Sequence, residues 1–291
     1  MQYMHARESQ RGGMAEEQRA LLFAGAVGGP FTIGLYTPLR NAITLGAGDA
    51  AASAGALYAT VLRTGPYTGW LSPTVFSCAQ FLALGPLYHI YAGAVGPTLA
   101  VVPTACTESL ISFGSQTRNA QMAFNAAVGA TERLPLQAPW DPRGVAFAPH
   151  VARNACAMSG FRVLSGPMQH ALDGAAAAAH LPLDRATANV AADFLASIIS
   201  AAVSMPFNQL FNYLATTTAA SRPAGVLTAC AGFLRSQYLV RTPSGRLGLS
   251  RTIVRDAFMR CAYIAPQLST YSAIERLCVS SASSAGLSSK P

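Results

Sequence analysis

Two stretches of the sequence decide the fold: residues 25–40 read GAVGGPFTIGLYTPLR, and residues 202–208 read AVSMPFN. Each is an apolar helical segment with a proline near its end, and proline bends or ends a helix. Related segments lie between and after them: residues 67–73 read YTGWLSP, residues 144–153 read GVAFAPHVAR, and residues 255–260 read RDAFMR. The recurrence of similar helix pairs predicts one repeat architecture rather than separate domains.

The composition favours a membrane environment. The chain has 291 residues, of which 51% are hydrophobic and 11% are charged, whereas a typical soluble protein is about 25% charged. Because a soluble domain needs a polar surface, this deficit indicates lipid as the outer solvent and disfavours a soluble enzyme with several buried layers. No clean run of about twenty apolar residues occurs, which suits helices that each keep a polar face towards a bundle interior.

The positive charge is distributed in a way that also favours a membrane protein. The formal net charge is +8, and the bases are arginines apart from Lys290. They are scattered rather than clustered with aromatic residues, so nucleic acid is not an expected partner. The arginines of the long loops are Arg63, Arg118, Arg133, Arg143, Arg222, Arg235, Arg241, Arg246 and Arg251. The shorter connections hold only Arg185, which places the long loops on the positive side of the membrane.

Six apolar segments define the predicted bundle: residues 20–45, 69–92, 95–117, 145–169, 187–213 and 252–277. Two stretches inside the long loops, 56–63 and 225–235, have helical periodicity and are expected to lie along the membrane surface. The predicted fold class is therefore all-α.

The sequence contains no recognisable chemistry for catalysis. The cysteines and histidines are dispersed, without the spacing of a metal site, so neither a metal nor a catalytic cofactor is expected. No nucleophile–histidine–acid arrangement, phosphate-binding loop or pair of carboxylates is recognised, so an enzyme is not expected. Residues 1–19 lack the apolar core of a secretory signal.

The order and recurrence of these segments resemble the mitochondrial carrier family from about residue 20 to residue 277. Pro38-Leu39 and Pro206-Phe207 resemble the start of the family's proline-containing kink motif, and residues 67–73 and 251–271 resemble its entry to the even-numbered helices. The resemblance implies a six-transmembrane-helix bundle with threefold pseudosymmetry, built from three helix-pair repeats with matrix surface helices. The implied organisation is a flexible tail (1–19), repeats 20–95, 96–185 and 186–279, and a C-terminal tail (280–291).

The matrix-gate positions depart from the family motif, in which an acid and a base on each odd-numbered helix form ion pairs between helices. The first copy has Arg40 at the acidic position, and the second has lost its proline. The positions in register are Pro38, Arg40 and Ile43, then Ser115, Thr117 and Ala120, then Pro206, Asn208 and Phe211. No copy keeps an acid–base pair.

The cytoplasmic-gate positions near the ends of the even-numbered helices are equally altered. They are His89 and Ala92, Ser165 and Met168, and Ser272 and Glu275. A buried ion pair is mainly useful as a switch, because its desolvation cost nearly cancels its attraction, and alternating access needs two states of similar free energy. With no pair at either gate, the sequence predicts a bundle that is fixed in one shape.

The family resemblance also implies positions that contact substrate in a central cavity. They fall at Ser77, Arg153 and Arg260, with Asn154 beside Arg153. Two buried arginines would attract a carboxylate or phosphate; the other interpretation is that they bind helix carbonyls or a lipid phosphate. Glu108 is expected to pair with an arginine of the bundle and to support packing rather than proton transfer. Arg162 and Arg255 are expected to pair with carboxylates such as Asp256 or to extend to the membrane surface, and His89 to lie at the interface.

Membrane lipid is an expected partner. No cofactor is expected apart from a bound phospholipid such as cardiolipin. The family's lipid sites lie at helix N-termini on the matrix side, where backbone N–H groups hold phosphate. The matching positions here are Gly69, Trp70 and Gly144.

The broken gates favour a non-transporting accessory subunit of a larger assembly, such as a respiratory complex or ATP synthase, in the mitochondrial inner membrane. In that case both termini face the intermembrane space, and other subunits of the complex are partners. The alternative is an exchanger for a carboxylate- or phosphate-type anion, held by Arg153 and Arg260. A second alternative is a divergent relative in the outer membrane.

Overall fold

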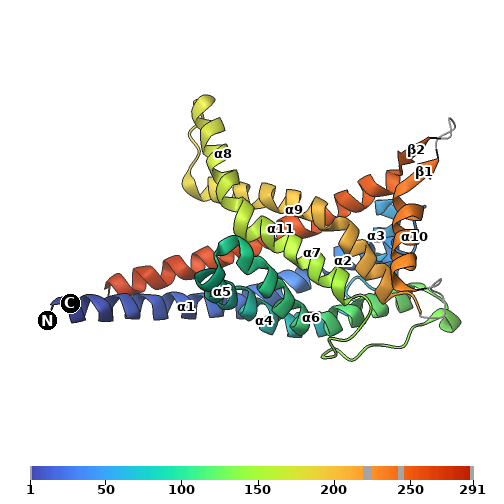
Figure 1. The fold of residues 1–291 in the computed structure, drawn as a ribbon, viewed down its shortest axis with the longest axis horizontal. Helices are drawn as coiled ribbons and strands as arrows, with labels where there is room; N and C mark the ends of the chain where they lie inside the picture. The colour runs from blue at the N-terminus through green and yellow to red at the C-terminus, as the bar shows by residue number, and fades with distance from the viewer. Residues whose placement is uncertain (1, 219–224, 242–245, 289–291) are drawn as a thin grey trace.

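The computed structural model describes residues 2–218, 225–241 and 246–288. These residues are mostly helical, as predicted (Figure 1). The helices are α1 (Gln2–Leu35), α2 (Thr37–Gly46), α3 (Ala54–Thr64), α4 (Leu71–Leu84), α5 (Pro86–Val95), α6 (Pro97–Ala127), η1 (Ala130–Glu132), α7 (Phe147–Ser159), η2 (Gly160–Leu164), α8 (Ser165–Ala178), α9 (Arg185–Ala215), α10 (Val226–Tyr238) and α11 (Arg251–Ser288). Two short strands, β1 (Leu239–Arg241) and β2 (Leu247–Leu249), form an antiparallel pair.

Each predicted apolar segment is helical, but several are divided. The first becomes α1 and α2, which meet at an angle of 54°. Pro38 lies in the first turn of α2, where proline is tolerated because the first N–H groups of a helix have no partner within the helix. The second divides at Gly85 into α4 and α5, and Pro86 starts α5. The fourth contains the π-helical turn η2 between α7 and α8.

The helices pack in chain order and close into a ring. α1 packs on α4, α4 and α5 on α6, α6 on α7, α7 on α9, and α9 on α11, which returns to α1. α1 and α11 run side by side at one end of the ring, and α3 and α10 lie at the opposite end (Figure 1). α2, α6 and α9 also contact one another, which narrows the ring towards that opposite end.

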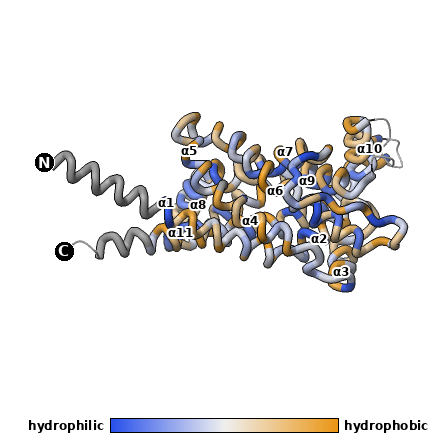
Figure 2. Tube along the Cα trace, turned by 90° about the horizontal axis from the view of Figure 1, so that it is seen from below, coloured by the Kyte–Doolittle hydropathy of each residue, from blue (hydrophilic) through white to orange (hydrophobic). Residues whose placement is uncertain are grey.

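Large apolar side chains cover the outside of this ring. On α1 they recur at helical spacing, at Phe23, Val27 and Phe31. On α6 Leu99 is 65% exposed, and on α11 Val254 is 69% exposed. Figure 2 shows hydrophobic positions along all helices of the body, interrupted by hydrophilic ones. Exposed large apolar side chains on several helices favour contact with lipid or with another protein.

One helix, Arg185–Ala215, is long and apolar enough to cross a membrane by itself, and the bent pair of α1 and α2 passes the same test together. α9 begins after Asp184, whose carboxylate accepts hydrogen bonds from the backbone N–H groups of Ala186 and Thr187 at 3.0 Å each. Hydrogen bonds from Thr187 and Ala186 lower the pKa of Asp184 below its usual value, so the cap stays ionised at neutral pH.

The structure differs from the sequence prediction at the tails and in the last long loop. α1 begins at Gln2, inside the segment predicted as a flexible tail, and α11 continues to Ser288. The strands β1 and β2 occupy a loop that the periodicity left without strands. Lys290 and Arg222 lie outside the described residues.

Glycines allow α1 and α4 to approach closely. A Cβ atom at Gly25 would lie 2.8 Å from the backbone oxygen of Phe81, and one at Gly29 would lie 2.8 Å from the Phe81 ring. Phe81 is almost fully buried in the main apolar cluster. Small residues at these two positions are therefore required for the packing, as is common where membrane helices touch.

We predict that Gly25→Ala lowers the free energy of unfolding by about 1–3 kcal/mol, because the added methyl group meets backbone that cannot rotate away. The matched control is Gly34→Ala on the same helix, where a Cβ atom would lie no closer than 3.9 Å to Thr74. Thermal unfolding of the two variants in detergent, followed by circular dichroism, measures the difference. Equal stability of both variants would contradict the close contact.

Candidate functional site

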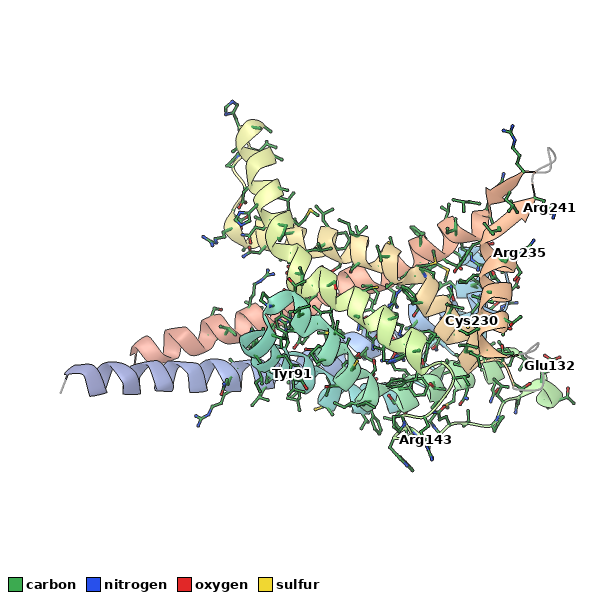
Figure 3. All side chains as sticks on the ribbon, in the orientation of Figure 1. Tyr91, Glu132, Arg143, Cys230, Arg235 and Arg241 are labelled. Atoms are coloured by element: carbon green, nitrogen blue, oxygen red, sulfur yellow. The ribbon has the colours of Figure 1, made fainter. Side chains whose placement is uncertain are left out.

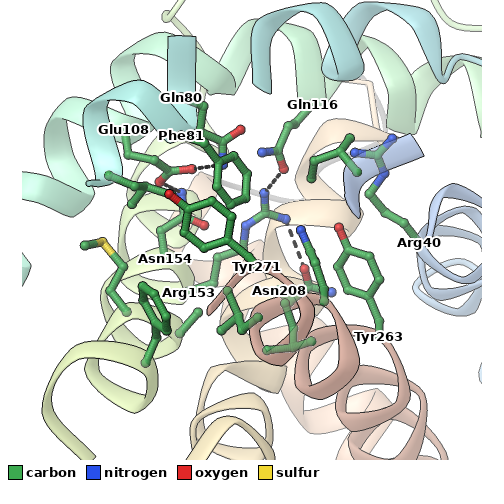
Figure 4. Close-up of a pocket in the computed structure, with 18 of the residues that line it drawn as sticks. Arg40, Gln80, Phe81, Glu108, Gln116, Arg153, Asn154, Asn208, Tyr263 and Tyr271 are labelled. Atoms are coloured by element: carbon green, nitrogen blue, oxygen red, sulfur yellow. Dashed lines mark hydrogen bonds between the residues drawn. The ribbon is translucent and has the colours of Figure 1, made fainter. Parts of the chain in front are cut away.

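A cavity of about 80 Å³ lies inside the ring. Its wall comes from α1, α2, α4, α6, α7, η2, α9 and α11 (Figure 4). Four charged side chains line it: Arg40, Glu108, Arg153 and Arg260. Two of these are the arginines that the family resemblance placed in a cavity, and the predicted neighbour Asn154 also lines it.

Arg153 on α7 lies at the centre of the wall and is 5% exposed. It donates one hydrogen bond to Asn208 Oδ1 at 3.0 Å and another to Gln116. Its guanidinium carbon lies 4.1 Å from the centre of the Phe211 ring, within the distance of a cation–π contact. These neutral contacts orient the guanidinium, but they do not cancel its charge.

Arg260 and Arg40 have fewer contacts than Arg153. Arg260 on α11 donates from Nε to Ser204 Oγ at 3.3 Å. Arg40 on α2 is 9% exposed, and none of its three side-chain nitrogens has a hydrogen-bond partner among the described residues. Tyr263 lies beside Arg40 (Figure 4) and interacts with it electrostatically without reaching hydrogen-bond geometry.

Glu108 on α6 is the only carboxylate among the residues that line this cavity. Its Oε1 accepts from Gln80 Nε2 at 2.5 Å and from Ser112 Oγ at 3.2 Å, and its Oε2 accepts from Asn154. Its hydrogen-bond donors are therefore amides and a hydroxyl, and it forms no ion pair with an arginine among the described residues. The prediction that Glu108 supports packing agrees with these contacts, because it joins α4, α6 and α7.

The charges that line the cavity do not balance. Three guanidinium groups face one carboxylate, and all four side chains are largely buried. A buried charge without a partner of opposite sign costs several kcal/mol. A bound anion would remove this cost and would meet donors that are already in place.

An aromatic layer lies next to Arg153, towards the end of the ring where α2, α6 and α9 meet. The His150 ring packs edge-on against Phe113 and Phe211 at centroid distances of 5.5 and 5.1 Å. His150 is fully buried, and its Nδ1 faces Asn154 Nδ2 at 3.2 Å. The layer therefore separates the cavity from the long-loop end of the ring.

An ion pair joins η2 to α11 near the end of the ring where α1 and α11 run side by side. The sequence predicted that Arg162 pairs with a carboxylate, but it did not identify Glu275 as the partner. Arg162 in η2 donates to both carboxylate oxygens of Glu275 on α11, at 3.0 and 3.2 Å. Both side chains are about nine-tenths buried, and Arg162 also lies 3.5 Å from the carbonyl oxygen of Leu84. The prediction that the cytoplasmic gate has no ion pair is therefore wrong.

The motif positions missed this pair because Arg162 lies one helical turn before Ser165, the position in register. At the same end of the ring, the Asp193 carboxylate on α9 accepts hydrogen bonds from Ser272 Oγ at 2.6 Å and from Arg276. Ser272 and Glu275 thus both contact charged side chains, and Glu275 is an acid at the position where the family motif has a base.

The remaining cytoplasmic-gate positions lie in different surroundings. Ser165 donates to the carbonyl oxygens of Gly160 and Phe161 in its own helix. His89 is exposed on α5, where its ring meets the Tyr88 ring edge-on, as expected for an interfacial residue. Ala92 and Met168 are half-buried.

No ion pair of the described residues joins the matrix-gate positions, as predicted. Arg40 and Asn208 line the cavity, and Phe211 contacts Arg153. Thr117 is buried with an unpartnered hydroxyl, and Ser115 donates to the carbonyl oxygen of Ser112. Pro206 lies inside α9, and the apolar positions Ile43 and Ala120 are buried in core clusters.

Arg255 joins elements at the long-loop end. It pairs with Asp256 at 2.8 Å, as predicted, and donates to the carbonyl oxygens of Gly46, Asp49 and Ala52 between α2 and α3. The other oxygen of the same Asp256 carboxylate accepts from the Tyr238 hydroxyl at 3.1 Å. One turn of α11 therefore holds both the α2–α3 connection and the end of α10.

Ser77 is not brought into the cavity. It is fully buried on α4, and its hydroxyl donates to the carbonyl oxygen of Thr74 at 2.6 Å. Gln80, one turn further along the same helix, lines the cavity instead and holds Glu108.

Of the three predicted lipid positions, the two glycines lie against α6. A Cβ atom at Gly69 would lie 2.8 Å from Asn119 Nδ2, and one at Gly144 would lie 2.8 Å from the Phe113 ring. Trp70 is partly exposed at the start of α4. Glycine at 69 also has a φ of +74°, which other residues rarely adopt. Packing against α6 thus accounts for both glycines without lipid.

Sequence reasoning missed several residues that the structure places at functional positions. Asp193 is an acid inside an apolar helix, and this alone marks a functional candidate. Gln80 and Gln116 gave no signal, because a single amide in an apolar helix does not reveal its partner. Among the described residues, no group of three or more His, Cys, Asp or Glu side chains is placed to hold a metal ion.

Comparison with protein-family models and with curated proteins finds no match for this chain.

We predict that Arg162→Gln lowers the free energy of unfolding by about 3–5 kcal/mol, because it leaves the buried Glu275 carboxylate unpaired. The double variant Arg162→Met/Glu275→Leu removes both charges and is expected to be more stable than the single variant. Denaturant titrations in detergent provide the comparison. If the double variant were less stable than Arg162→Gln, the instability of the single variant could not come from the desolvation cost of an unpaired Glu275 carboxylate.

Proposed function

We propose that this chain is a membrane protein of the mitochondrial carrier type that binds a small carboxylate- or phosphate-type anion in its central cavity and exchanges it across the membrane. The observation that carries the proposal is the excess of buried positive charge at Arg40, Arg153 and Arg260 over Glu108. Guanidinium groups bind carboxylate and phosphate with matched geometry.

The arrangement of the helices supports the carrier-type bundle. The ring closes through contacts between α11 and α1, and α3 and α10 lie outside it at the positions expected for matrix surface helices. The exposed apolar side chains on α1, α6, α9 and α11 are suited to lipid. In this proposal six helical segments cross the membrane, with threefold pseudosymmetry. Within the part of the chain that the structure describes, α9 alone and the bent pair of α1 and α2 are long and apolar enough to span it by length and composition.

The size of the cavity supports a small ligand. Its volume of about 80 Å³ is well below the roughly 300 Å³ at which sites for drug-sized molecules begin. A single phosphate or a short carboxylate matches this volume in the observed shape, whereas a nucleotide does not.

The ion pair between Arg162 and Glu275 supports exchange rather than a fixed scaffold. It joins η2 to α11 beside the cavity, and these are different repeats of the proposed bundle. A pair that is present in one shape and broken in another contributes differential stability to the two states, which alternating access requires. A permanently closed bundle would gain little from a buried pair, because apolar side chains are often at least as stabilising there.

We predict that phosphate or a short carboxylate raises the thermal stability of the purified protein in detergent, since binding to the folded state stabilises it. Arg153→Gln is expected to weaken binding by about 10- to 100-fold, which corresponds to the loss of one charge-assisted hydrogen bond. The matched control is Arg118→Gln, because Arg118 contacts the Gln137 carbonyl oxygen and does not line the cavity.

The same variants can be compared in liposomes for exchange of labelled phosphate, sulfate and di- and tricarboxylates. Uptake that is abolished by Arg153→Gln and kept by Arg118→Gln would support exchange. Binding that is unaffected by Arg153→Gln would overturn the assignment of the cavity.

A second candidate function is a non-transporting accessory subunit of a larger inner-membrane assembly. The matrix-gate positions lack ion pairs among the described residues. In addition, α8 and the start of α9 leave the body as an arm (Figure 1), with Leu181 and Leu183 exposed on the connection. Such an arm suits contact with other subunits.

For this second candidate we predict that gently solubilised source membranes release the chain in a complex far larger than its mass of 30.3 kDa. Native gel electrophoresis with detection of the chain measures this. Migration close to the size of a monomer would exclude a stable subunit. Separation of inner from outer mitochondrial membranes tests the location, and recovery in the outer membrane would favour the alternative of a divergent outer-membrane relative. Lipid analysis of the same sample tests for bound cardiolipin.

A further inference from the structure

A second positively charged site lies at the long-loop end, between α10 and the β1–β2 hairpin. The hairpin extends sideways from the ring beside α10 (Figure 1), and Arg235 and Arg241 lie close to this corner of the molecule (Figure 3). A groove of about 300 Å³ separates the hairpin from α10. The residues that line it are Gly232, Arg235, Ser236, Leu239, Arg241 and Leu247.

The base of this hairpin is held firmly. Tyr238, directly before β1, is buried, and its hydroxyl contacts Asp256 Oδ2 and Met205 Sδ at 3.1 Å each. The backbone N–H of Ser250 donates to the carbonyl oxygen of Tyr238 at 2.9 Å and closes the hairpin base. On α10, Phe233 stacks on Tyr213 at a centroid distance of 4.5 Å. The groove therefore lies between two anchored walls.

The strand register places arginine and leucine side chains on one face. Leu239 pairs with Leu249, and Arg241 pairs with Leu247. Because side chains alternate between the faces of a strand, these four share a face, and Val240 lies on the other. Three of the four line the groove, which confirms that this face is turned towards α10.

The groove is positively charged and apolar at once. The sequence from residue 226 to residue 250 contains no Asp or Glu, and neither Arg235 nor Arg241 has an ion-pair partner among the described residues. Leu247 is 62% exposed and Leu249 is 69% exposed. Exposed leucines beside unpaired arginines are typical of segments that lie at an anionic membrane surface.

We propose that this groove binds the headgroup of an anionic phospholipid, with Arg235 and Arg241 on its phosphate and the leucines of the hairpin in the acyl region. The inference rests on the proposed membrane location but not on the central cavity. An acidic protein would satisfy the arginines but would leave the leucines without apolar contacts, so the lipid accounts for both features. The predicted sites at Gly69, Trp70 and Gly144 lie on other elements.

The test uses the full-length protein in neutral detergent, titrated with phosphatidylglycerol or with phosphatidylcholine, and native mass spectrometry to count retained lipid. Wild type is expected to prefer phosphatidylglycerol. Arg235→Gln/Arg241→Gln is expected to bind phosphatidylglycerol about 30-fold more weakly, given the usual contribution of two arginines at an anionic surface. The matched control, Arg133→Gln/Arg143→Gln, removes two exposed arginines from the same end and should keep wild-type affinity.

A second variant keeps both arginines. A Cβ atom at Gly232 meets nothing within 4 Å, so Gly232→Glu fits the fold and places a carboxylate in the groove next to Arg235. It is expected to weaken phosphatidylglycerol binding as the double variant does, while thermal stability stays at or above the wild-type value.

Three results would overturn the proposal: equal retention of both lipids, equal loss in the control, or tighter binding of soluble glycerol phosphate or polyglutamate than of phosphatidylglycerol. The polyglutamate result would identify an acidic protein as the occupant. Extraction of the protein from source membranes by alkaline carbonate tests the membrane location separately. Binding of small anions in the central cavity is a further independent readout.

Discussion

The structure depends on how a ring of helices accommodates buried positive charge. Three arginines reach the same small space from α2, α7 and α11, and the one carboxylate that faces them is held by amides and a hydroxyl. Desolvating a guanidinium is costly, and neutral acceptors recover only part of that cost. The excess therefore has to be met by water or by an anion that enters the cavity. The chemistry proposed for this chain follows from that imbalance rather than from any one motif.

The two ends of the ring are built differently. At the end where α1 and α11 run side by side, Arg162 and Glu275 form a buried pair, and Asp193 gathers Ser272 and Arg276. At the other end, helices meet through an aromatic layer around His150, through asparagine contacts such as Asn41 with the Thr68 carbonyl oxygen, and through small residues. The strength of the ion pairs that close one end depends on the local dielectric and on competing ions. The strength of the aromatic and amide contacts that close the other end depends on how well the side chains fit together. The two closures would therefore respond to different changes in their surroundings.

The sequence was sufficient to predict that the apolar segments are helical, because segments of this length with prolines near their ends are compatible with few structures other than helices. It also placed Arg153, Asn154 and Arg260 at one cavity, through the spacing that the family resemblance supplies. It failed for Arg162 and Glu275, because they lie 113 residues apart and Arg162 is one turn away from the motif position. It failed for Ser77 as well, since the facing direction of a side chain near Pro73 depends on packing. The β1–β2 hairpin was missed because two strands of three residues carry too little periodicity.

A single turn of α11 connects parts of the chain that are remote in sequence. Arg255 holds the connection between α2 and α3, and Asp256 holds Tyr238 at the root of the hairpin. If α11 tilts, the α2–α3 connection and the root of the hairpin cannot respond separately, because both are bound to adjacent residues of this one helix. The opening of this end would then be concerted. A lipid bound at the hairpin would oppose the tilt of α11, because Asp256 on α11 holds the root of the hairpin.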